Sequence, residues 1–305
     1  MKDQINAVYI LGLGALGSIY AEKLYDLSPD KVRIIADPDR AKKNSGITIN
    51  GKPYALNYIT PNDRTAPPAD LILVAVKSPQ LHQAIRDLQS FVGKDTVVLS
   101  LLNGISSEEI IGKEIGMDHL LYSYGLGMDA VREGNVIRYA NMGRVIFGEK
   151  RNEVLSPRVQ AIKELFERAQ IPYQIPVDMQ KALWLKFMMN TGINQVSAVL
   201  KAPYGPFQRD GEARRLMLSA SEEVLALSRA MDIGLEPGDI VTFLKILDTL
   251  HPEGKTSMLQ DIEAGRTSEV DLFAGTVIQL GKKYNVATPV NDMLYRIIRA
   301  LEEVK

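Results

Sequence analysis

The start of the sequence carries a glycine pattern that restricts the possible folds more than any other feature of the chain. An apolar run of strand length, residues 7–11, leads directly into Gly12-Leu13-Gly14-Ala15-Leu16-Gly17, and a helical pattern follows. In such a strand–turn–helix unit, the first glycine makes the tight turn, the second lets the backbone approach a pyrophosphate, and the third lets helix and strand pack closely. The pattern therefore predicts a dinucleotide-binding turn, with an ordinary structural turn as the alternative.

An acidic residue follows this turn at the spacing of a dinucleotide-binding unit. Asp37 stands twenty positions after Gly17, at the end of a second apolar run, residues 32–36. A carboxylate at the end of the second strand suits a hydrogen bond to a ribose 2′-hydroxyl. The pyrophosphate would lie at the helix N-terminus, where the helix dipole favours an anion. We therefore expect Asp37 to face a dinucleotide cofactor.

Strands and helices alternate through the first half of the chain. Residues 70–76 and 96–101 are apolar on both faces, as central parallel strands covered by helices should be. A hairpin around Asn50-Gly51 is predicted at residues 47–54, and a helix at 153–169. Further strands are predicted at residues 120–124, 135–140, 143–148 and 172–175. This alternation predicts an α/β Rossmann-type dinucleotide-binding domain over residues 1–177.

From residue 178 onward, only helical periodicity remains. The predicted helices cover residues 179–200, 212–231, 238–250, 257–264 and 269–284, and a last one starts at Pro289 with Thr288 as its N-cap. We therefore predict an all-α C-terminal domain over residues 178–305 that carries substrate and catalytic residues. Ligands commonly bind between two domains.

Composition excludes several classes of protein. The 305 residues contain no cysteine, which excludes disulfides, thiolate metal sites and a cysteine nucleophile, and the three histidines have no ligand spacing. The net charge of −1 gives no reason to expect binding to nucleic acid or to an anionic membrane. Apolar runs are shorter than the ~20 residues of a membrane span, and the first residues lack a signal-peptide core. We therefore expect a cytoplasmic protein without a metal site.

Two polar residues follow the two central strands. Lys77 comes directly after residues 70–76, and Asn103 follows residues 96–101. Open parallel sheets bind ligands outside the carboxyl ends of their strands. Lys77 could contact a cofactor phosphate or ribose as a point charge, and Asn103 could offer its amide to substrate or nicotinamide. Both could equally be solvated loop residues.

The helix predicted from residue 179 carries an unusual polar stripe. Lys186, Asn190 and Asn194 recur at every fourth position and therefore share one face of the helix. A solvated stripe usually consists of Glu, Lys and Arg, and asparagine is a poor helix former. The two asparagines on this otherwise apolar helix therefore favour hydrogen bonding to a specific ligand.

Two later positions are ambiguous from their residues alone. Ser257 begins a predicted helix, and its hydroxyl either caps that helix or faces a ligand. Glu269 follows Ser268, a candidate N-cap, and an acidic residue in a first turn is ordinarily explained by the helix dipole. A ligand-binding role for either residue needs support from elsewhere.

Together, these motifs resemble the ketopantoate reductase (2-dehydropantoate 2-reductase) family over almost the whole chain. The resemblance rests on the glycine turn, Val76-Lys77, Asn103-Gly104, Leu183-Trp184-x-Lys186-x-x-x-Asn190-x-x-x-Asn194, Ser257-Met258-Leu259-Gln260-Asp261 and Glu269-Val270-Asp271. The lysine–asparagine helix with the later motifs is far more specific than the glycine turn. The resemblance implies a Rossmann domain, a helical domain and an active site between them. It also implies reduction of ketopantoate to pantoate with NADPH, in the pathway to pantothenate and coenzyme A.

The resemblance implies roles for individual residues as well. The family's catalytic lysine corresponds to Lys186 and its active-site glutamate to Glu269. Positions that hold the substrate or orient the nicotinamide ring correspond to Asn103, Asn190, Asn194 and Ser257. The family's cofactor-binding glycines and lysine also have counterparts in this chain. The predicted cofactor-binding residues are Gly12, Leu13, Gly14, Ala15, Leu16, Gly17, Asp37, Lys77 and Asn103.

One departure from the family pattern leaves the cofactor open between NADPH and NADH. The family commonly has an arginine at the end of the second strand, where it can meet the 2′-phosphate of NADPH, but Asp37 stands there in this chain. A carboxylate suits the ribose hydroxyl of NADH and repels a phosphate. Arg40, or Arg33 if the strand register differs, could still reach the phosphate.

Two other functions compete with this interpretation. A related 2-keto- or β-hydroxy-acid dehydrogenase could share the architecture and differ only in its substrate pocket. A non-catalytic NAD(P)H-sensing protein would need no lysine and asparagines on one helix face, which disfavours it. We expect a small 2-keto acid as the binding partner, no nucleic acid and no membrane, and a possible homodimer.

Overall fold

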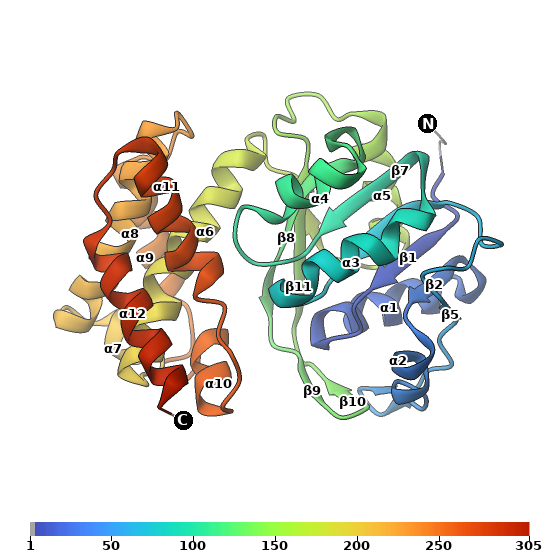
Figure 1. The fold of residues 1–305 in the computed structure, drawn as a ribbon, viewed down its shortest axis with the longest axis horizontal. Coiled ribbons are helices and arrows are strands. Elements are labelled where there is room, and N and C mark those ends of the chain that lie inside the picture. The colour runs from blue at the N-terminus through green and yellow to red at the C-terminus, as the bar shows by residue number, and fades with distance from the viewer. Residues whose placement is uncertain (1–3, 305) are drawn as a thin grey trace. The chain divides into compact units, whose positions relative to one another are not determined.

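The computed structural model describes residues 4–304 of the chain, which form two compact units that meet in sequence after Met179 (Figure 1). The first unit is α/β and the second is helical, as predicted. The domain limits of 1–177 and 178–305 remain a prediction of where separately folding parts begin and end.

The large sheet of the first unit has the strand order β12-β11-β8-β7-β6-β1-β2-β5. From β5 to β8, all neighbouring strands are parallel, while β11 runs antiparallel to β8 and parallel to β12. When the six strands from β5 to β8 are numbered by their order along the chain, their order across the sheet is 3-2-1-4-5-6, as in the doubly wound Rossmann fold. The strands are β1 (Val8–Leu11), β2 (Val32–Ile35), β5 (Tyr58–Ile59), β6 (Ala69–Val74), β7 (Val92–Ser100), β8 (Leu120–Met128), β11 (Met142–Gly148) and β12 (Tyr173–Gln174).

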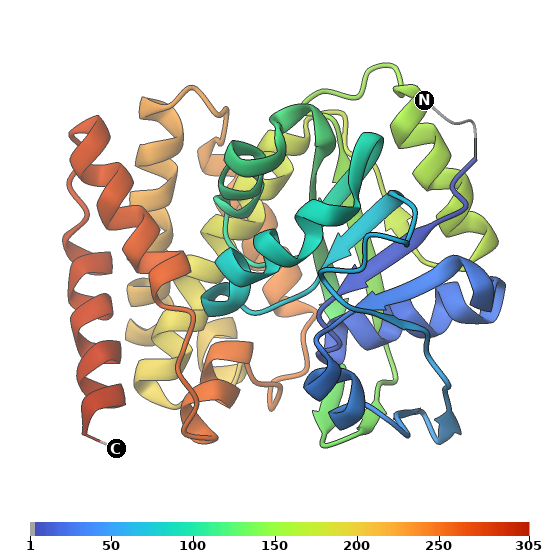
Figure 2. The same cartoon turned by 45° about the vertical axis from the view of Figure 1, so that its right-hand side comes forward.

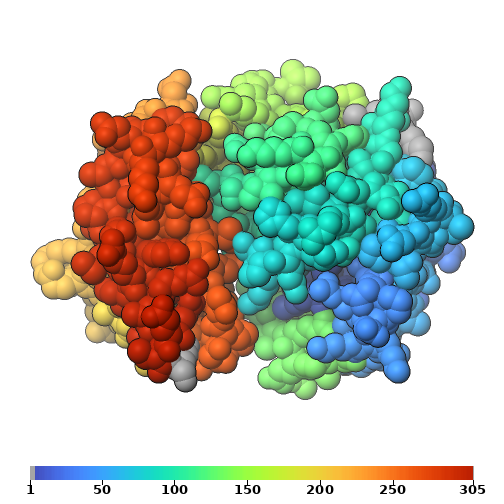
Figure 3. All heavy atoms as spheres, viewed as in Figure 1, coloured from blue at the N-terminus to red at the C-terminus, as the bar shows by residue number. Residues whose placement is uncertain are grey.

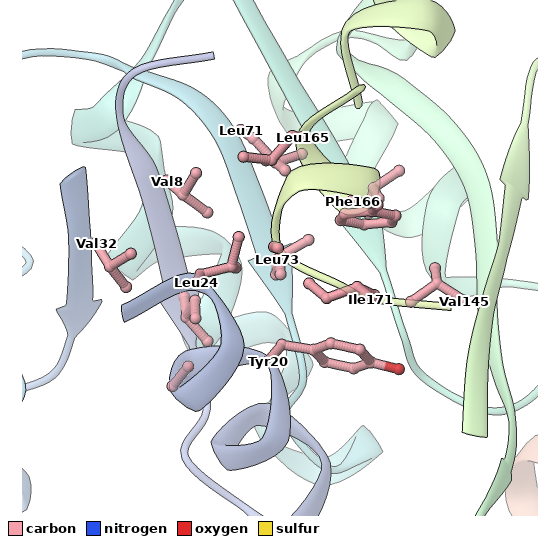
Figure 4. Close-up of a cluster of buried hydrophobic side chains, with 14 of the residues drawn as sticks. Val8, Tyr20, Leu24, Val32, Leu71, Leu73, Val145, Leu165, Phe166 and Ile171 are labelled. Carbon is pink, nitrogen blue, oxygen red and sulfur yellow. The ribbon is translucent and has the colours of Figure 1, made fainter. Parts of the chain in front are cut away.

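Helices cover both faces of this sheet, which explains why its central strands are apolar throughout. Figures 1 and 2 show α1 (Ala15–Leu27) and α5 (Pro157–Arg168) on one face, and α3 (Leu81–Leu88) and α4 (Ser107–Ile115) on the other. Tyr20 and Leu24 of α1 and Phe166 of α5 converge on the first face (Figure 4). A leucine or phenylalanine side chain buried in this way contributes about 1.5–3 kcal/mol. Short 3-10 turns complete the unit at Pro29–Lys31, Ser78–Gln80, Gln89–Phe91 and Met117–His119.

A small second sheet with the order β4-β3-β10-β9 belongs to the first unit. Its strands are β3 (Thr48–Ile49), β4 (Lys52–Pro53), β9 (Val131–Glu133) and β10 (Val136–Arg138). The predicted hairpin is confirmed, because Asn50 and Gly51 have φ of 48° and 80° between antiparallel β3 and β4. In Figure 3, the green residues around 135 lie against the blue residues around 45, where α2 (Pro38–Lys43) ends.

The described residues of the second unit form helices joined by loops, without a strand. Its helices are α6 (Met179–Leu200), α7 (Gly205–Gln208), α8 (Glu212–Ala230), α9 (Pro237–Asp248), α10 (Ser257–Glu263), α11 (Thr276–Tyr284) and α12 (Pro289–Glu303). The single helix predicted over residues 269–284 is instead a π-helical turn, Asp271–Gly275, followed by α11. Among residues 4–304, no helix is both long and apolar enough to cross a membrane.

The start of α12 is stabilised by a residue that the sequence does not indicate. Thr288 occupies the N-cap position with Pro289 after it, as predicted, but its side chain makes no capping hydrogen bond. Instead, the carboxylate of Glu223 on α8 accepts hydrogen bonds from the backbone N–H of Val290 (2.7 Å) and of Asn291 (3.0 Å). It also accepts one from the Asn291 amide at 2.7 Å. An anion at a helix N-terminus is favoured by the dipole, so this contact joins α8 to α12.

We predict that Glu223→Ala destabilises the protein by about 2–4 kcal/mol, because it leaves buried donors without an acceptor. The free energy of unfolding, measured by urea denaturation followed by circular dichroism, tests this. The matched control is Glu222→Ala at the exposed neighbouring position, which should change stability by no more than about 0.5 kcal/mol. Equal effects of the two substitutions would contradict the capping role.

Candidate functional site

The carboxyl ends of four neighbouring parallel strands line up across the large sheet. Leu11 of β1 lies opposite both Ile35 of β2 and Val74 of β6, and Val74 lies opposite Ser100 of β7. Four of the residues predicted to bind in this half of the chain follow these ends within three positions: Gly12, Asp37, Lys77 and Asn103. The fold therefore brings them to one edge of the sheet, where such sheets bind ligands.

The turn after β1 has the geometry that its glycines predict. Gly12 has φ +103°, and a Cβ there would lie 2.6 Å from the Ala75 carbonyl oxygen. A Cβ on Gly17 would lie 1.9 Å from the Gly12 carbonyl oxygen, so α1 packs directly on the turn. Gly14 is the N-cap of α1, and this helix has neither a side-chain cap nor an acidic residue in its first turn. A helix N-terminus exposed in this way fits the pyrophosphate of a dinucleotide.

Asp37 also has a structural task, as the N-cap of α2. Its carboxylate caps α2 by accepting a hydrogen bond from the Arg40 backbone N–H at 2.8 Å, and it pairs with the Arg40 Nε at 3.3 Å. The Asp37 side chain is still 48% exposed. A carboxylate has about four acceptor positions, so the capped Asp37 keeps capacity for a ribose hydroxyl.

Arg33, in contrast, does not lie at the strand end. It pairs in register with Tyr9 near the start of β2, and its guanidinium donates a hydrogen bond to the Tyr9 hydroxyl at 3.0 Å. The alternative register that would place Arg33 near a 2′-phosphate is therefore wrong. Arg40 on α2 pairs with Asp37 and stays the candidate for contact with a 2′-phosphate.

A groove of about 530 Å³ opens beside Asp37. Its walls come from the start of α2, from the segment after β5 and from the exposed side of α3: Asp37, Pro38, Thr60, Pro61, Asn62, Gln83, Arg86 and Asp87. This groove adjoins the expected ribose position and has room for a planar base.

In the second unit, Lys186, Asn190 and Asn194 occupy successive turns of one unbroken helix, α6. Asn194 is only 5% exposed, and Lys186 and Asn190 are half-buried. Phe187, on another side of the helix, is buried in the core. These three side chains are therefore too buried to form a fully solvated polar stripe.

Ser257 does not cap its helix, contrary to the capping alternative. The N-cap of α10 is Thr256, whose Oγ1 accepts a hydrogen bond from the Leu259 backbone N–H at 3.2 Å. The same hydroxyl donates to Ser197 Oγ on α6 at 3.1 Å. The start of α10 is thereby fixed to α6 one turn beyond Asn194, and the exposed Ser257 hydroxyl is not needed for capping.

Glu269 lies just before the π-helical turn, in a segment that α6 and α12 both hold. Phe273 of the turn stacks on Phe187, the neighbour of Lys186, with 6.5 Å between ring centroids. On the other side, the Ser268 backbone N–H donates to the Glu302 carboxylate at 2.7 Å. Turns of this type often occur at functional sites. The segments of Ser257 and Glu269 therefore both attach to α6.

The sequence gives no signal for one side chain that contacts the glycine turn. Arg132 of β9 donates a hydrogen bond to the Leu13 carbonyl oxygen within the glycine turn. The two residues are 119 positions apart, and no motif surrounds Arg132.

No group of three or more His, Cys, Asp or Glu residues suited to a metal ion occurs within residues 4–304.

Known proteins are similar to this chain over almost its whole length. Residues 8–152 match the family described as ketopantoate reductase PanE/ApbA, and residues 178–302 match its C-terminal part. The 2-dehydropantoate 2-reductase of Pyrococcus horikoshii is 30% identical over 97% of this chain and 98% of its own length.

Solved structures share the fold. A D-mandelate dehydrogenase with NADH and anilino(oxo)acetate has a TM-score of 0.87 at 24% identity, covering 98% of both chains. The dimeric ketopantoate reductase of Staphylococcus aureus has a TM-score of 0.81 at 22% identity, covering 98% of this chain and 99% of its own. Given the family matches along both units and the identity to a full-length relative, the chain belongs to the ketopantoate reductase family of NAD(P)H-dependent oxidoreductases.

Proposed function

We propose that this protein reduces 2-dehydropantoate (ketopantoate) to pantoate with NADH or NADPH, as a step towards pantothenate and coenzyme A. The observation that carries the proposal is the half-buried stripe of Lys186, Asn190 and Asn194 on α6. A protein that only senses a dinucleotide has no use for this stripe. The relatives named 2-dehydropantoate 2-reductase support the choice of substrate.

The first unit would hold the cofactor. The pyrophosphate would bind at the N-terminus of α1, between the backbone groups of Leu13, Ala15 and Leu16, because Gly12, Gly14 and Gly17 leave room for it. Asp37 would face the adenine ribose, and Lys77 and Asn103 would lie at the ends of β6 and β7 near the phosphates and the nicotinamide. When bound, the dinucleotide supplies the hydride that is transferred to the ketone carbon.

The second unit would supply the charge and the proton. Lys186 would stabilise the negative charge that develops on the ketone oxygen and then donate its proton to that oxygen. A lysine in its ammonium form carries both the positive charge and the proton that these two steps need. The carboxylate of Glu269 would favour the charged ammonium and balance its charge.

Amide and hydroxyl groups would hold the substrate. Asn103, Asn190, Asn194 and Ser257 offer donors and acceptors suited to a carboxylate and hydroxyl groups. The capping of α10 by Thr256 supports this role for Ser257, because its own hydroxyl remains available. The half-buried positions on α6 would make an unmet hydrogen bond costly, and this cost favours a substrate with matching polar groups.

A related 2-keto acid is the alternative substrate, and the D-mandelate dehydrogenase with the same fold illustrates it. Steady-state kinetics with ketopantoate and a panel of other 2-keto acids, each with NADH and with NADPH, tests the proposal. We expect ketopantoate to have the highest kcat/KM. A higher kcat/KM for an aryl keto acid would make that acid the substrate. No cofactor oxidation with any of the keto acids would favour a sensing protein.

We also propose that the protein is cytoplasmic and forms a homodimer.

We predict that Asp37→Arg raises the ratio of kcat/KM for NADPH to that for NADH by at least about tenfold, because an attractive charge replaces a repulsive one. Tenfold corresponds to about 1.36 kcal/mol, within the range of a single charge pair near a protein surface. The variant also loses the cap of α2. Asp37→Asn keeps a capping side chain and removes the charge, so it should shift the ratio in the same direction.

The matched control for Asp37→Arg is Asp39→Arg, which makes the same change at an exposed position two residues along α2. Its cofactor ratio should stay within about twofold of the wild-type ratio, since exposed charges away from the ligand are screened by salt. An unchanged ratio for Asp37→Arg itself would show that Asp37 does not face the ribose.

We predict that Lys186→Ala lowers kcat with ketopantoate by ~10²–10⁴-fold, the usual contribution of a general acid, while the Kd of the cofactor changes little. Activity, cofactor titration by fluorescence and a thermal melt together test this. Lys201→Ala, at an exposed position just after α6, should retain wild-type kcat. A folded Lys186→Ala protein with most of the wild-type kcat would rule out Lys186 as the acid.

A further inference from the structure

The side chain of Arg132 joins three separate segments of the first unit. Its Nη1 donates to the Leu13 carbonyl oxygen in the glycine turn. Its Nη2 donates to Asn44 Oδ1 at 2.7 Å and to Asn135 Oδ1 at 3.3 Å, and its Nε donates to the Gly134 carbonyl oxygen at 2.8 Å. A side chain on β9 thus connects the turn after β1 with the end of α2.

These contacts leave little of the guanidinium for a ligand. A guanidinium has five N–H donors in a rigid planar fork, and four of the Arg132 donors already have protein acceptors. Burial lowers the pKa of Arg132 from its ordinary value, which reflects the partial removal of its charge from water. The side chain therefore holds protein segments together, and a second phosphate contact is not its main task.

Two of the three segments that Arg132 joins would hold the adenosine half of a dinucleotide. Leu13 lies in the turn that fits the pyrophosphate. Asn44 is the C-cap of α2, the short helix whose N-cap is Asp37, beside the expected ribose. Asn135 reinforces this end of α2, because its amide donates to the Lys43 and Ser45 carbonyl oxygens at 2.8 Å each.

The small sheet that carries Arg132 is itself fixed to α1. Glu22 of α1 accepts hydrogen bonds from the Tyr139 hydroxyl, just after β10, and from the Tyr54 hydroxyl, just after β4, the latter at 3.2 Å. Arg132 is therefore presented by a sheet that cannot shift easily relative to α1. It acts as a strut of fixed length between the turn and α2.

We propose that Arg132 is a positioning residue for cofactor binding, which sets the separation between the glycine turn and α2 so that both match one dinucleotide. The proposal rests on the proposed function only in that the protein binds NAD(P)H. Its physical basis is preorganisation: a site whose two halves are already spaced for the ligand avoids the cost of ordering them on binding.

The experiment compares Arg132→Met and Arg132→Lys with Arg138→Met as the matched control. Arg138 lies on β10 of the same small sheet, and its exposed side chain pairs loosely with Glu133 at 3.7 Å. The Kd values of NADH, NADPH and ADP-ribose are measured by fluorescence or calorimetry, and kcat is measured at saturating cofactor. Thermal melts of the ligand-free proteins report stability separately.

We expect Arg132→Met to raise the Kd of all three ligands by about 10–100-fold, with kcat at saturating cofactor within about twofold of wild type, because the ordering cost acts on binding alone. Arg132→Lys should lose most of the same affinity, since an ammonium cannot span the three segments. Arg138→Met should bind like wild type. Full affinity in Arg132→Lys would overturn the proposal, because a point charge would then suffice.

A second variant keeps the test decisive if Arg132→Met does not fold. Asn44→Ala removes only the α2 end of the strut at a half-exposed position, and it should raise the Kd for ADP-ribose in the same direction by a smaller factor. Folded Arg132 and Asn44 variants with wild-type Kd would overturn the positioning role. A wild-type protein that binds neither NADH nor NADPH would instead overturn the proposed function.

Discussion

The close contact between the glycine turn and its neighbours is the constraint on which the cofactor half of the protein depends. A side chain at Gly17 would collide with the Gly12 carbonyl, and one at Gly12 would collide with the Ala75 carbonyl after β6. Because both positions lack a Cβ, α1 can begin immediately at the end of β1 and point its N-terminus to the edge where the parallel strands end. The same packing buries Tyr20 and Leu24 of α1 in the core beneath the sheet.

In the second unit, buried polar contacts hold the helix that carries the proposed catalytic residues. Gln195 of α6, next to Asn194, donates a hydrogen bond to Asn291 Oδ1 of α12 at 3.0 Å, and Asn291 in turn donates to Glu223 of α8. Buried amide donors of this kind require one particular alignment of their helices, because any other leaves them without an acceptor. The orientation of α6, and with it the direction of its polar stripe, is therefore set by contacts behind it.

Local signals predict most of the fold, and long-range contacts explain what they miss. The glycine turn, the apolar central strands and the change to helical periodicity are encoded within short segments, and the structure confirms them. Either of two adjacent hydroxyl residues, Thr256 and Ser257, could be the N-cap of α10. Thr256 is the cap, and its hydrogen bond to Ser197 on α6 is a contact that the local sequence does not show. The capping of α12 by Glu223 and the strut formed by Arg132 join residues far apart in the sequence, so no periodicity could indicate them. The roles of Lys186, Asn190, Asn194, Ser257 and Glu269 stay predictions.

A crystal structure with NAD(P)H and an unreactive ketopantoate analogue bound tests the central claim most directly. The account predicts that the Lys186 ammonium lies within hydrogen-bond distance, about 2.7–3.2 Å, of the oxygen that replaces the ketone oxygen. It also predicts that the pyrophosphate lies on the N-terminus of α1. An analogue bound away from α6, with Lys186 remote from the reacting oxygen, would contradict the account.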